Sequence, residues 1–349
     1  MQTKLTKQIR VFNEDLPNTA GRMFDDVSGI LNWDDIKNQT YYEVYKDMRE
    51  KFWVPDEVSM QQDISQWVND QIEPEEKELF KNGIGVLAVL DSIATYFDKI
   101  AADYIRDSAI KANMSFISAM ETIHNESYTY TLSSLVDKEE AKEIFERPKN
   151  NPYALKRNDL MMDLFNEFLI EKTPENMAKG LIAMAGLEGL CFVNGFTPFY
   201  HLNRSGKMFG TGTMVQFIQR DEVKHSYFQT VLVRDILTQY PEINTDKFSD
   251  FVYKFFEDLV QLERDFCDDL YKNVSDIDVE EVKEYVGFRA NLILDNLGLD
   301  KIFSAKKNPM DWVTAYDPDN INSIKRDSFE DKELNYAKAS EELNEWDDL

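Results

Sequence analysis

The stretch ETIHNESY, residues 121–128, places a glutamate, a histidine and a tyrosine at positions i, i+3 and i+7. In an α-helix these three side chains share one face, because steps of three and four residues both come close to a full turn. A second stretch, RDEVKH at residues 220–225, repeats the glutamate, two-residue gap and histidine. The chain has three histidines, so two of the three follow a glutamate at this spacing. Two such matches on separate helices indicate a shared site far more strongly than one match would.

Glutamate and histidine at i and i+3 project from one helix face toward a common point. Two such helices, with carboxylates from two others, supply the inward-facing ligands of a di-metal carboxylate four-helix bundle. Two further carboxylates are therefore expected in apolar helices, where an unpaired charge is costly to bury. Asp91 in GVLAVLDSIA and Glu188 in LIAMAGLEGLCF meet this description. The candidate ligands are Asp91, Glu121, His124, Glu188, Glu222 and His225. Such a set suits two iron or manganese ions, with Glu121 and Glu222 as the expected bridges.

Each of these residues also has a simpler interpretation. A lone acidic residue in an apolar helix is often partly exposed or paired with Lys or Arg, and a lone E-x-x-H is usually a solvated helix face. Tyr128 taken alone would be a core tyrosine whose hydroxyl has a partner, but it stands one turn beyond His124. His201, in FYHLNR, has no partner pattern and is interpreted as structural. The six candidate ligands together favour a metal site.

The remaining sequence favours helices around this site. Hydrophobic residues make up 43% and charged residues 30% of the chain, with 13 Gly and 10 Pro in 349 residues, which indicates a mostly α fold. Long helices are expected from Pro74 through GVLAVLDSIATYF, over DSAIKANMSFISAMETIHNESYTYTLSSL, from TPEN to LEGLCFVNGF, over MVQFIQRDEVKHSYFQTVLVRDIL, and over about 246–273 and 278–297. The prediction is one domain over residues 1–305, with core helices over about 74–297. Residues 306–349 are polar and acidic and are expected to form a flexible tail.

Charge and cysteine content exclude several classes of protein. The net charge of −26 argues against binding to nucleic acid or to anionic membranes. The amino terminus, MQTKLTKQIR, has no apolar stretch behind it, and no run approaches the ~18 apolar residues of a membrane span. Cys191 and Cys267 are the only cysteines, which excludes a disulfide framework and a cysteine-based zinc site. A cytoplasmic protein fits best.

Taken in order, these motifs resemble the small, radical-generating subunit (R2 or β) of class I ribonucleotide reductase. That family has an aspartate in an L-D-S-I type helix, then E-x-x-H-x-x-x-Y, then a lone glutamate followed by aromatic residues, then R-D-E-x-x-H. This chain has LDSI at 90–93, ETIHNESY at 121–128, EGLCF at 188–192 and RDEVKH at 220–225. The resemblance covers about residues 40–315. It implies an all-α, ferritin-like helical bundle, a homodimer and a dinuclear iron or manganese centre held by the six candidate ligands.

The resemblance also implies a place to store the oxidation. Tyr128 would be the radical tyrosine, and Phe192, Phe196 and Ile218 would form the apolar pocket around it. Water exclusion is the reason for such a pocket, because any reductant that reaches a phenoxyl radical quenches it. The metal pair itself is the alternative store.

A route for the radical follows from the same resemblance. Trp53, in FWVPDEV, would transfer the radical together with Asp221 and the ligand His124; taken alone, Trp53 would be a core tryptophan. Tyr336, in ELNYAKAS, would relay the radical to the large catalytic subunit, and the terminal EELNEWDDL would dock there.

The resemblance therefore implies a ribonucleoside-diphosphate reductase β subunit that is active only with its large subunit, which reduces ribonucleotides to deoxyribonucleotides. The activating oxidant would be dioxygen or superoxide, and a flavoprotein activase is a further partner in some classes. Two alternatives stay open. One is an R2-like di-metal oxidase or oxygenase, and the other is a ferritin-type iron store. Tyr128, Trp53 and the docking-like tail argue against both.

Overall fold

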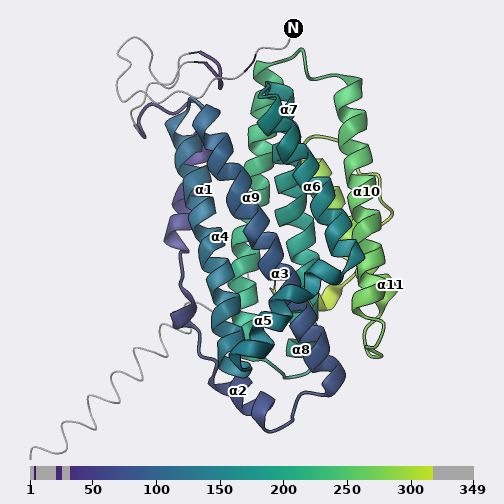
Figure 1. Cartoon of the computed structure of the whole chain (residues 1–349). Helices are drawn as coiled ribbons and strands as arrows, with labels where there is room; N and C mark the ends of the chain where they lie inside the picture. Colours follow the sequence, from purple (N-terminus) through teal and green to yellow (C-terminus); the bar gives the residue numbers. More distant parts are fainter. Residues whose placement is uncertain (1–3, 5–20, 26–31, 317–349) are drawn as a thin grey trace, which may run out of the picture.

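The computed structural model describes residue 4, residues 21–25 and residues 32–316. These described residues form helices and connecting loops and contain no strand. The α-helices are α1 Thr40–Glu50, α2 Gln61–Val68, α3 Pro74–Ala101, α4 Ser108–Leu135, α5 Lys138–Glu146, α6 Pro152–Ile170, α7 Pro174–Gly186, α8 Val193–Arg204, α9 Phe209–Gln239, α10 Asp246–Leu270 and α11 Val279–Asn296. Short 3-10 turns cover η1 Pro55–Glu57, η2 Ala102–Tyr104, η3 Arg147–Asn150 and η5 Asp311–Tyr316, and a π-helix, η4, covers Leu187–Phe192. In Figure 1 the long helices lie alongside one another as a bundle.

The ligand-bearing helices begin where the sequence supplies caps. Before α3, Glu73 and Glu76 form a capping box around Pro74. Before α4, the Asp107 carboxylate accepts hydrogen bonds from two backbone amides, and before α7 the Thr173 hydroxyl accepts one. These contacts satisfy amides that have no partner within their own helix. The predicted starts at Pro74 and at TPEN are therefore confirmed.

The start of α9 depends on a distant residue. Asp63 of α2 is fully buried, and its carboxylate accepts hydrogen bonds from the backbone amides of Gly210 at 2.8 Å and Thr211 at 2.7 Å. A carboxylate at a helix N-terminus is also favoured by the helix dipole. Through this cap, α2 fixes the position of the helix that carries RDEVKH.

The core of the bundle lies between α3, α4, α7 with η4, and α9. The largest helix contacts are those of α3 with α4 and of α7 with α9. Asn125 of α4 donates to the Ala88 carbonyl of α3 at 3.0 Å, and His124 faces Asp91, so α3 and α4 run antiparallel. At Gly180, a Cβ atom would lie 2.2 Å from the ring of Phe97, so glycine is what allows α7 to approach α3 this closely.

The predicted helix from TPEN through LEGLCF is longer and less regular than expected. It continues from α7 through the π-helix η4 into α8, which contains Pro198. The segment Pro174–Arg204 spans 31 residues, and an 18-residue window within it has a mean hydropathy of 1.4, which is long and apolar enough to cross a membrane. Its most apolar window is 100% buried inside the bundle, which is the behaviour of a core helix.

Residues 306–316, at the start of the predicted tail, include side chains that pack on the body of the protein. Met310 and Val313 are buried, and Trp312 donates to Glu281 at 3.2 Å. Tyr316 stacks on Tyr200 with ring centroids 4.1 Å apart. Residues 306–316 therefore pack on the body, because their apolar side chains outweigh the polar composition of the longer segment. Residues 317–349, which include Tyr336 and EELNEWDDL, lie outside the described residues.

Candidate metal centre

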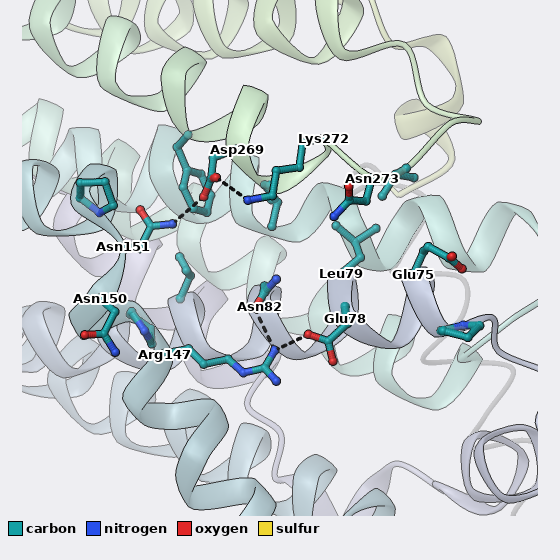
Figure 2. A pocket seen from close by; sticks show the side chains of 17 residues that line it. Glu75, Glu78, Leu79, Asn82, Arg147, Asn150, Asn151, Asp269, Lys272 and Asn273 are labelled. Atoms are coloured by element: carbon teal, nitrogen blue, oxygen red, sulfur yellow. Dashed lines mark hydrogen bonds and ion pairs between the residues drawn. The ribbon is translucent and has the colours of Figure 1, made fainter.

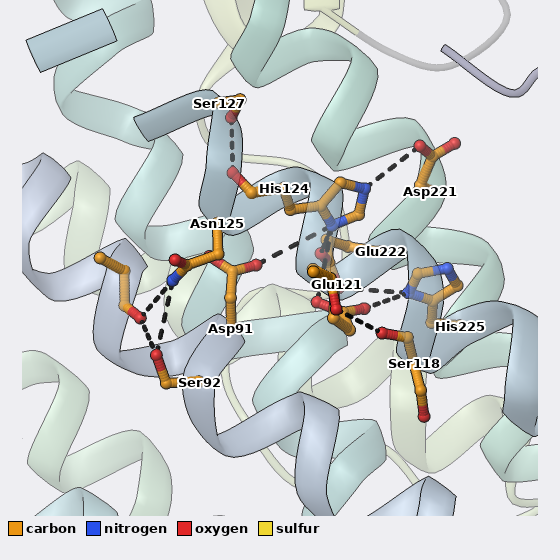
Figure 3. A network of polar contacts seen from close by, with 12 residues as sticks. Asp91, Ser92, Ser118, Glu121, His124, Asn125, Ser127, Asp221, Glu222 and His225 are labelled. Carbon is orange, nitrogen blue, oxygen red and sulfur yellow. Dashed lines mark hydrogen bonds and ion pairs between the residues drawn. The ribbon is translucent and has the colours of Figure 1, made fainter. Parts of the chain in front are cut away.

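The structure brings all six predicted ligands together inside the bundle. The elements that carry them are α3 for Asp91, α4 for Glu121 and His124, η4 for Glu188, and α9 for Glu222 and His225. All six side chains are buried. Figure 3 shows Asp91 and the residues of α4 and α9 converging from their separate helices.

The ligand atoms form two overlapping groups, in each of which the atoms lie within 4.8 Å of one another. The first group, called position A, consists of Asp91, Glu121, His124 and Glu222. The second group, called position B, consists of Glu121, Glu188, Glu222 and His225. Glu121 and Glu222 belong to both groups, which is the arrangement that two bridging carboxylates require.

The two histidines turn the same ring nitrogen toward the centre. Nδ1 of His124 lies 3.0 Å from Glu222 and 3.5 Å from Glu121. Nδ1 of His225 lies 2.8 Å from Glu121 and 3.6 Å from Glu222. The two imidazole rings are nearly parallel, with centroids 6.0 Å apart and an interplanar angle of 22°. Each histidine is therefore oriented to bind one ion of a pair.

The donor atoms fit a pair of divalent cations. Both oxygens of Asp91 and both oxygens of Glu188 are buried without a hydrogen-bond partner among the described residues. Unpaired buried carboxylates are costly. The two donor groups together contain four buried carboxylates and two imidazoles. Two divalent cations would neutralise four carboxylates. Oxygen and imidazole donors without thiolate suit iron or manganese.

Without cations, protons balance part of this charge. Burial, followed by the charge of Glu121, raises the pKa of Asp91 well above its ordinary value. Burial, followed by the charge of Asp98, raises the pKa of Glu188 in the same way. Burial also raises the pKa of Glu121, but hydrogen bonds with both histidines outweigh it and lower the pKa to about 2. Metal ions that bind these carboxylates would displace protons.

The π-helix gives Glu188 its place in the centre. A Cβ atom on the neighbouring Gly189 would lie 2.3 Å from the hydroxyl of Ser226, so glycine allows α9 to pack directly on η4. The Ser226 hydroxyl donates to the Ala185 carbonyl at 2.9 Å and so joins α9 to the end of α7, just before η4. Sequence periodicity predicted Glu188 but not the π-turn, which occurs frequently at functional sites.

Trp53, Asp221 and His124 are also brought together. The indole Nε1 of Trp53 donates to Oδ2 of Asp221 at 2.8 Å, and Nε2 of His124 lies 3.3 Å from the same oxygen. The rings of Trp53 and His124 are stacked, with centroids 6.0 Å apart. Burial raises the pKa of Asp221, but the hydrogen bond with His124 and the charge of Arg220 outweigh it, so the net pKa is lowered. Asp221 is therefore an ionised acceptor between Trp53 and a histidine of position A.

Tyr128 is buried, and its hydroxyl interacts with the Asp91 carboxyl group. Burial, followed by the negative charges of Asp91 and Glu222, raises the pKa of Tyr128 well above its ordinary value. The predicted pocket residues Phe192, Phe196 and Ile218 are fully buried, and the two phenylalanine rings lie 6.0 Å apart.

The third histidine lies outside the centre. Nε2 of His201 is 3.1 Å from the exposed residue Asp276, and His201 belongs to neither group of donor atoms. This placement agrees with its structural interpretation.

A buried pair next to the centre was missed by the sequence analysis. Asp98 of α3 is fully buried and accepts a hydrogen bond from Gln229 of α9 at 2.7 Å. Asp98 stands seven residues after Asp91 in the same apolar helix, so the signal that indicated Asp91 was present for Asp98 as well.

Comparison with known proteins identifies the family. The sequence model described as "Ribonucleotide reductase, small chain" matches residues 30–309. The chain belongs to the ribonucleotide reductase small-chain family.

Known relatives are similar to this small chain in sequence and structure over most of its length. It is 39% identical over 324 residues to the ribonucleoside-diphosphate reductase subunit beta of Halalkalibacterium halodurans, and the match covers 92% of each chain. The ribonucleotide reductase R2 subunit from Clostridium botulinum has a TM-score of 0.84 and 25% identity, covering 90% of this chain and 99% of that one. The dimanganese(II)-NrdF of Streptococcus sanguinis has a TM-score of 0.71 and 26% identity, covering 79% of this chain and 94% of that one. The predicted ferritin-like helical fold and family are confirmed.

The small chain also has a surface pocket of about 770 Å³ away from the metal centre. It lies between the start of α3, η3 with the start of α6, and the end of α10. Figure 2 shows Arg147 paired with Glu78 and Lys272 paired with Asp269 in this pocket. Arg147 donates to Glu78 at 2.8 Å, and Asp269 accepts from Asn151 at 3.0 Å and Lys272 at 2.9 Å. None of the six candidate ligands lines this pocket.

Proposed function

We propose that this small chain generates and holds a one-electron oxidising equivalent for a separate large subunit, which reduces ribonucleotides to deoxyribonucleotides. The observation that carries the proposal is the Asp221 carboxylate, which contacts both Trp53 and His124. This contact links the metal centre to an aromatic side chain that can carry an electron. Neither an iron store nor an oxidase that reacts with its own substrate needs such a link.

The cofactor is a dinuclear centre of iron or manganese. Asp91 and His124 would hold an ion at position A, Glu188 and His225 would hold an ion at position B, and Glu121 and Glu222 would contribute to both positions. Support comes from the two overlapping donor groups and from the dimanganese form of the Streptococcus sanguinis relative. When bound, the metal pair supplies a one-electron oxidation after it has reacted with dioxygen or superoxide.

Tyr128 holds the oxidising equivalent as a phenoxyl radical. Its burial, with the raised pKa, keeps the hydroxyl protonated until the tyrosine is oxidised. Phe192, Phe196 and Ile218 form its apolar surroundings and exclude water and external reductants. The buried positions of these three side chains support this role.

Trp53 carries the equivalent away from the centre. Loss of an electron makes the indole N–H strongly acidic, and Asp221 Oδ2, at 2.8 Å, is placed to take that proton. The lowered pKa of Asp221, which the hydrogen bond with His124 and the charge of Arg220 produce against burial, keeps the carboxylate ready to accept it. The electron that Trp53 loses would reduce the Tyr128 radical, and its proton would go to Asp221, so that the indole is left as an uncharged radical.

The tail completes the route to the large subunit. Tyr336 relays the radical, and EELNEWDDL docks on the large subunit; both lie outside the described residues. The protein acts in the cytoplasm, and a flavoprotein that delivers the oxidant is a further partner.

The small chain forms a homodimer through the outer face of α3 and α4. A groove of about 860 Å³ lies there and is lined by Tyr96 and by small uncharged residues such as Ser115, Ala119 and Thr122. Tyr96 is 64% exposed, and the charged residues of the groove, Lys99, Asp103 and Lys111, give it a net charge of +1 in a chain with a net charge of −26. Ala119→Arg should convert the dimer to a monomer in light scattering, and an unchanged mass would contradict this interface.

Reconstitution tests the function directly. The metal-loaded chain, mixed with the large subunit of the same organism and a ribonucleoside diphosphate, should form deoxyribonucleotide, whereas either subunit alone should not. Product formed by this chain alone, or none from the mixture at any metal loading, would contradict the proposal.

A further inference from the structure

A buried acid and amide lie beside the metal centre without belonging to either donor group. Asp98 and Gln229 are both fully buried. Gln229 Nε2 donates to Asp98 Oδ2 at 2.7 Å, which joins α3 to α9 across the interior of the bundle. Asp98 contributes no atom to position A or position B. A buried carboxylate is costly, so its presence here needs an explanation.

Helix geometry puts this pair at the end of the centre that holds position B. Asp98 follows Asp91 by seven residues on α3, and Gln229 follows His225 by four residues on α9, so both point inward one or two turns beyond a ligand. Tyr128 lies toward the other end, because it follows His124 by four residues on α4, which runs antiparallel to α3.

Three polar atoms at this end lack partners. Nε2 of His225, Oε1 of Gln229 and Oδ1 of Asp98 are buried without a hydrogen bond to any described residue. The other histidine differs, because Nε2 of His124 faces the Asp221 carboxylate at 3.3 Å. A histidine bound to a metal through one ring nitrogen almost always donates its other N–H to a fixed acceptor. Gln229, one turn beyond His225 on the same helix, can supply that acceptor.

The charge of Asp98 acts on residues of position B. After burial, Asp98 is the strongest influence that raises the pKa of Glu188. The pKa of Asp98 itself is raised to about 7, chiefly by burial, and the hydrogen bond with Gln229 and the charge of His225 lower it in part. Asp98 is therefore coupled electrostatically to both Glu188 and His225, the two donors that belong to position B alone.

We propose that Gln229 and Asp98 are positioning residues for the ion at position B. With the ion bound at Nδ1 of His225, the Nε2–H of His225 donates to Oε1 of Gln229, and Nε2–H of Gln229 donates to Asp98. The relay fixes the imidazole ring and increases its basicity, as Asp221 does for His124. This inference rests on the proposed function, because it takes His225 as a ligand. If the inference holds, the ion at position B is bound more tightly than the six ligands alone would bind it.

Manganese titration of the full-length, metal-free chain tests the relay. Free Mn(II) measured by electron paramagnetic resonance gives separate affinities for the two ions. Asp98→Asn and Gln229→Met should each lower the affinity for one ion, the ion at position B, by about 10–100-fold, which is the usual effect of removing such a support. The affinity for the other ion should not change. The variant Asp235→Asn is the control, because it removes a carboxylate on the same helix that accepts a hydrogen bond from Tyr41 at 2.6 Å. Asp235 lies about 15 Å further along α9 than His225.

Thermal unfolding of the metal-free variants separates positioning from a purely structural role. Asp98→Asn removes a buried charge and should not lower the midpoint temperature of unfolding. It should nevertheless lower the affinity for the ion at position B. A lower midpoint temperature of unfolding, together with an equal loss of affinity for both ions, would contradict the proposal. Wild-type affinities for both ions in both variants would also contradict it, while the ligand assignment would stand. Fewer than two ions in the wild-type chain would instead overturn that assignment and this inference with it.

Discussion

Glu121 on α4 and Glu222 on α9 each present one oxygen to His124 and the other to His225. Oε2 of Glu121 lies 3.5 Å from Nδ1 of His124, and its Oε1 lies 2.8 Å from Nδ1 of His225. Oε1 of Glu222 lies 3.0 Å from His124, and its Oε2 lies 3.6 Å from His225. Each carboxylate is therefore oriented to share its two oxygens between two ions.

This sharing predicts different losses for different ligands. Glu121→Ala and Glu222→Ala should each reduce the metal content from two ions to less than one, because both positions lose a donor. Asp91→Ala and Glu188→Ala should each leave one ion bound. Metal analysis after dialysis measures the content, with His201→Gln, the histidine outside the centre, as a control that keeps two ions. One ion retained in Glu121→Ala would contradict a bridging role.

Tyr128→Phe should remove the radical and leave the metal centre in place. The Tyr128 hydroxyl is buried and interacts with the Asp91 carboxyl group, so its removal should lower the free energy of unfolding by no more than about 1 kcal/mol. Electron paramagnetic resonance after oxidation checks for the tyrosyl signal. Tyr41→Phe is the matched control. Tyr41→Phe should keep the tyrosyl signal. Its free energy of unfolding should fall by about 1.5–3 kcal/mol, because the Tyr41 hydroxyl donates to the Asp235 carboxylate. A tyrosyl signal that persists in Tyr128→Phe would assign the radical elsewhere.

Trp53→Phe should uncouple radical storage from turnover. The variant keeps an aromatic ring against His124 but loses the N–H that Asp221 accepts. The radical yield should match wild type, while nucleotide reduction with the large subunit should fall by about 100-fold or more, because proton and electron can no longer move together. Trp67→Phe, at a tryptophan that packs on Phe80, should retain turnover. Wild-type turnover by Trp53→Phe would exclude this route.

Removal of residues 330–349 should abolish binding to the large subunit and leave two ions and the radical intact. The deleted segment contains both Tyr336 and EELNEWDDL. Tyr336→Phe in the full chain should bind normally but fail to support turnover. Surface plasmon resonance measures the binding, and unchanged affinity after truncation would contradict the docking role.

The sequence predicted the metal centre because its information is local and periodic. E-x-x-H at one face of each of two helices, with Asp91 and Glu188 in apolar runs, identifies six side chains that must point inward. Asp98 carries the same signal as Asp91, and its spacing of seven residues was sufficient to find it. Gln229 carries no such signal, because an uncharged amide in a helix has no distinctive cost until its buried partner is known.

Other features depend on tertiary contacts. The π-helix that carries Glu188 and the close packing of its Gly189 on Ser226 leave no mark on hydrophobic periodicity. The packing of residues 306–316 depends on Met310 and Val313, two apolar side chains in a polar segment. Helices α5 and α6 were also left unassigned by the sequence analysis, although Asp137 and Asn151 cap them.

The most direct measurement of the central claim is the electron paramagnetic resonance spectrum of the Mn(II)-loaded chain with its metal content. The account predicts two ions per chain and a spectrum of two coupled Mn(II) ions, because Glu121 and Glu222 bridge them. One ion per chain, or two ions with the spectrum of isolated Mn(II), would contradict it.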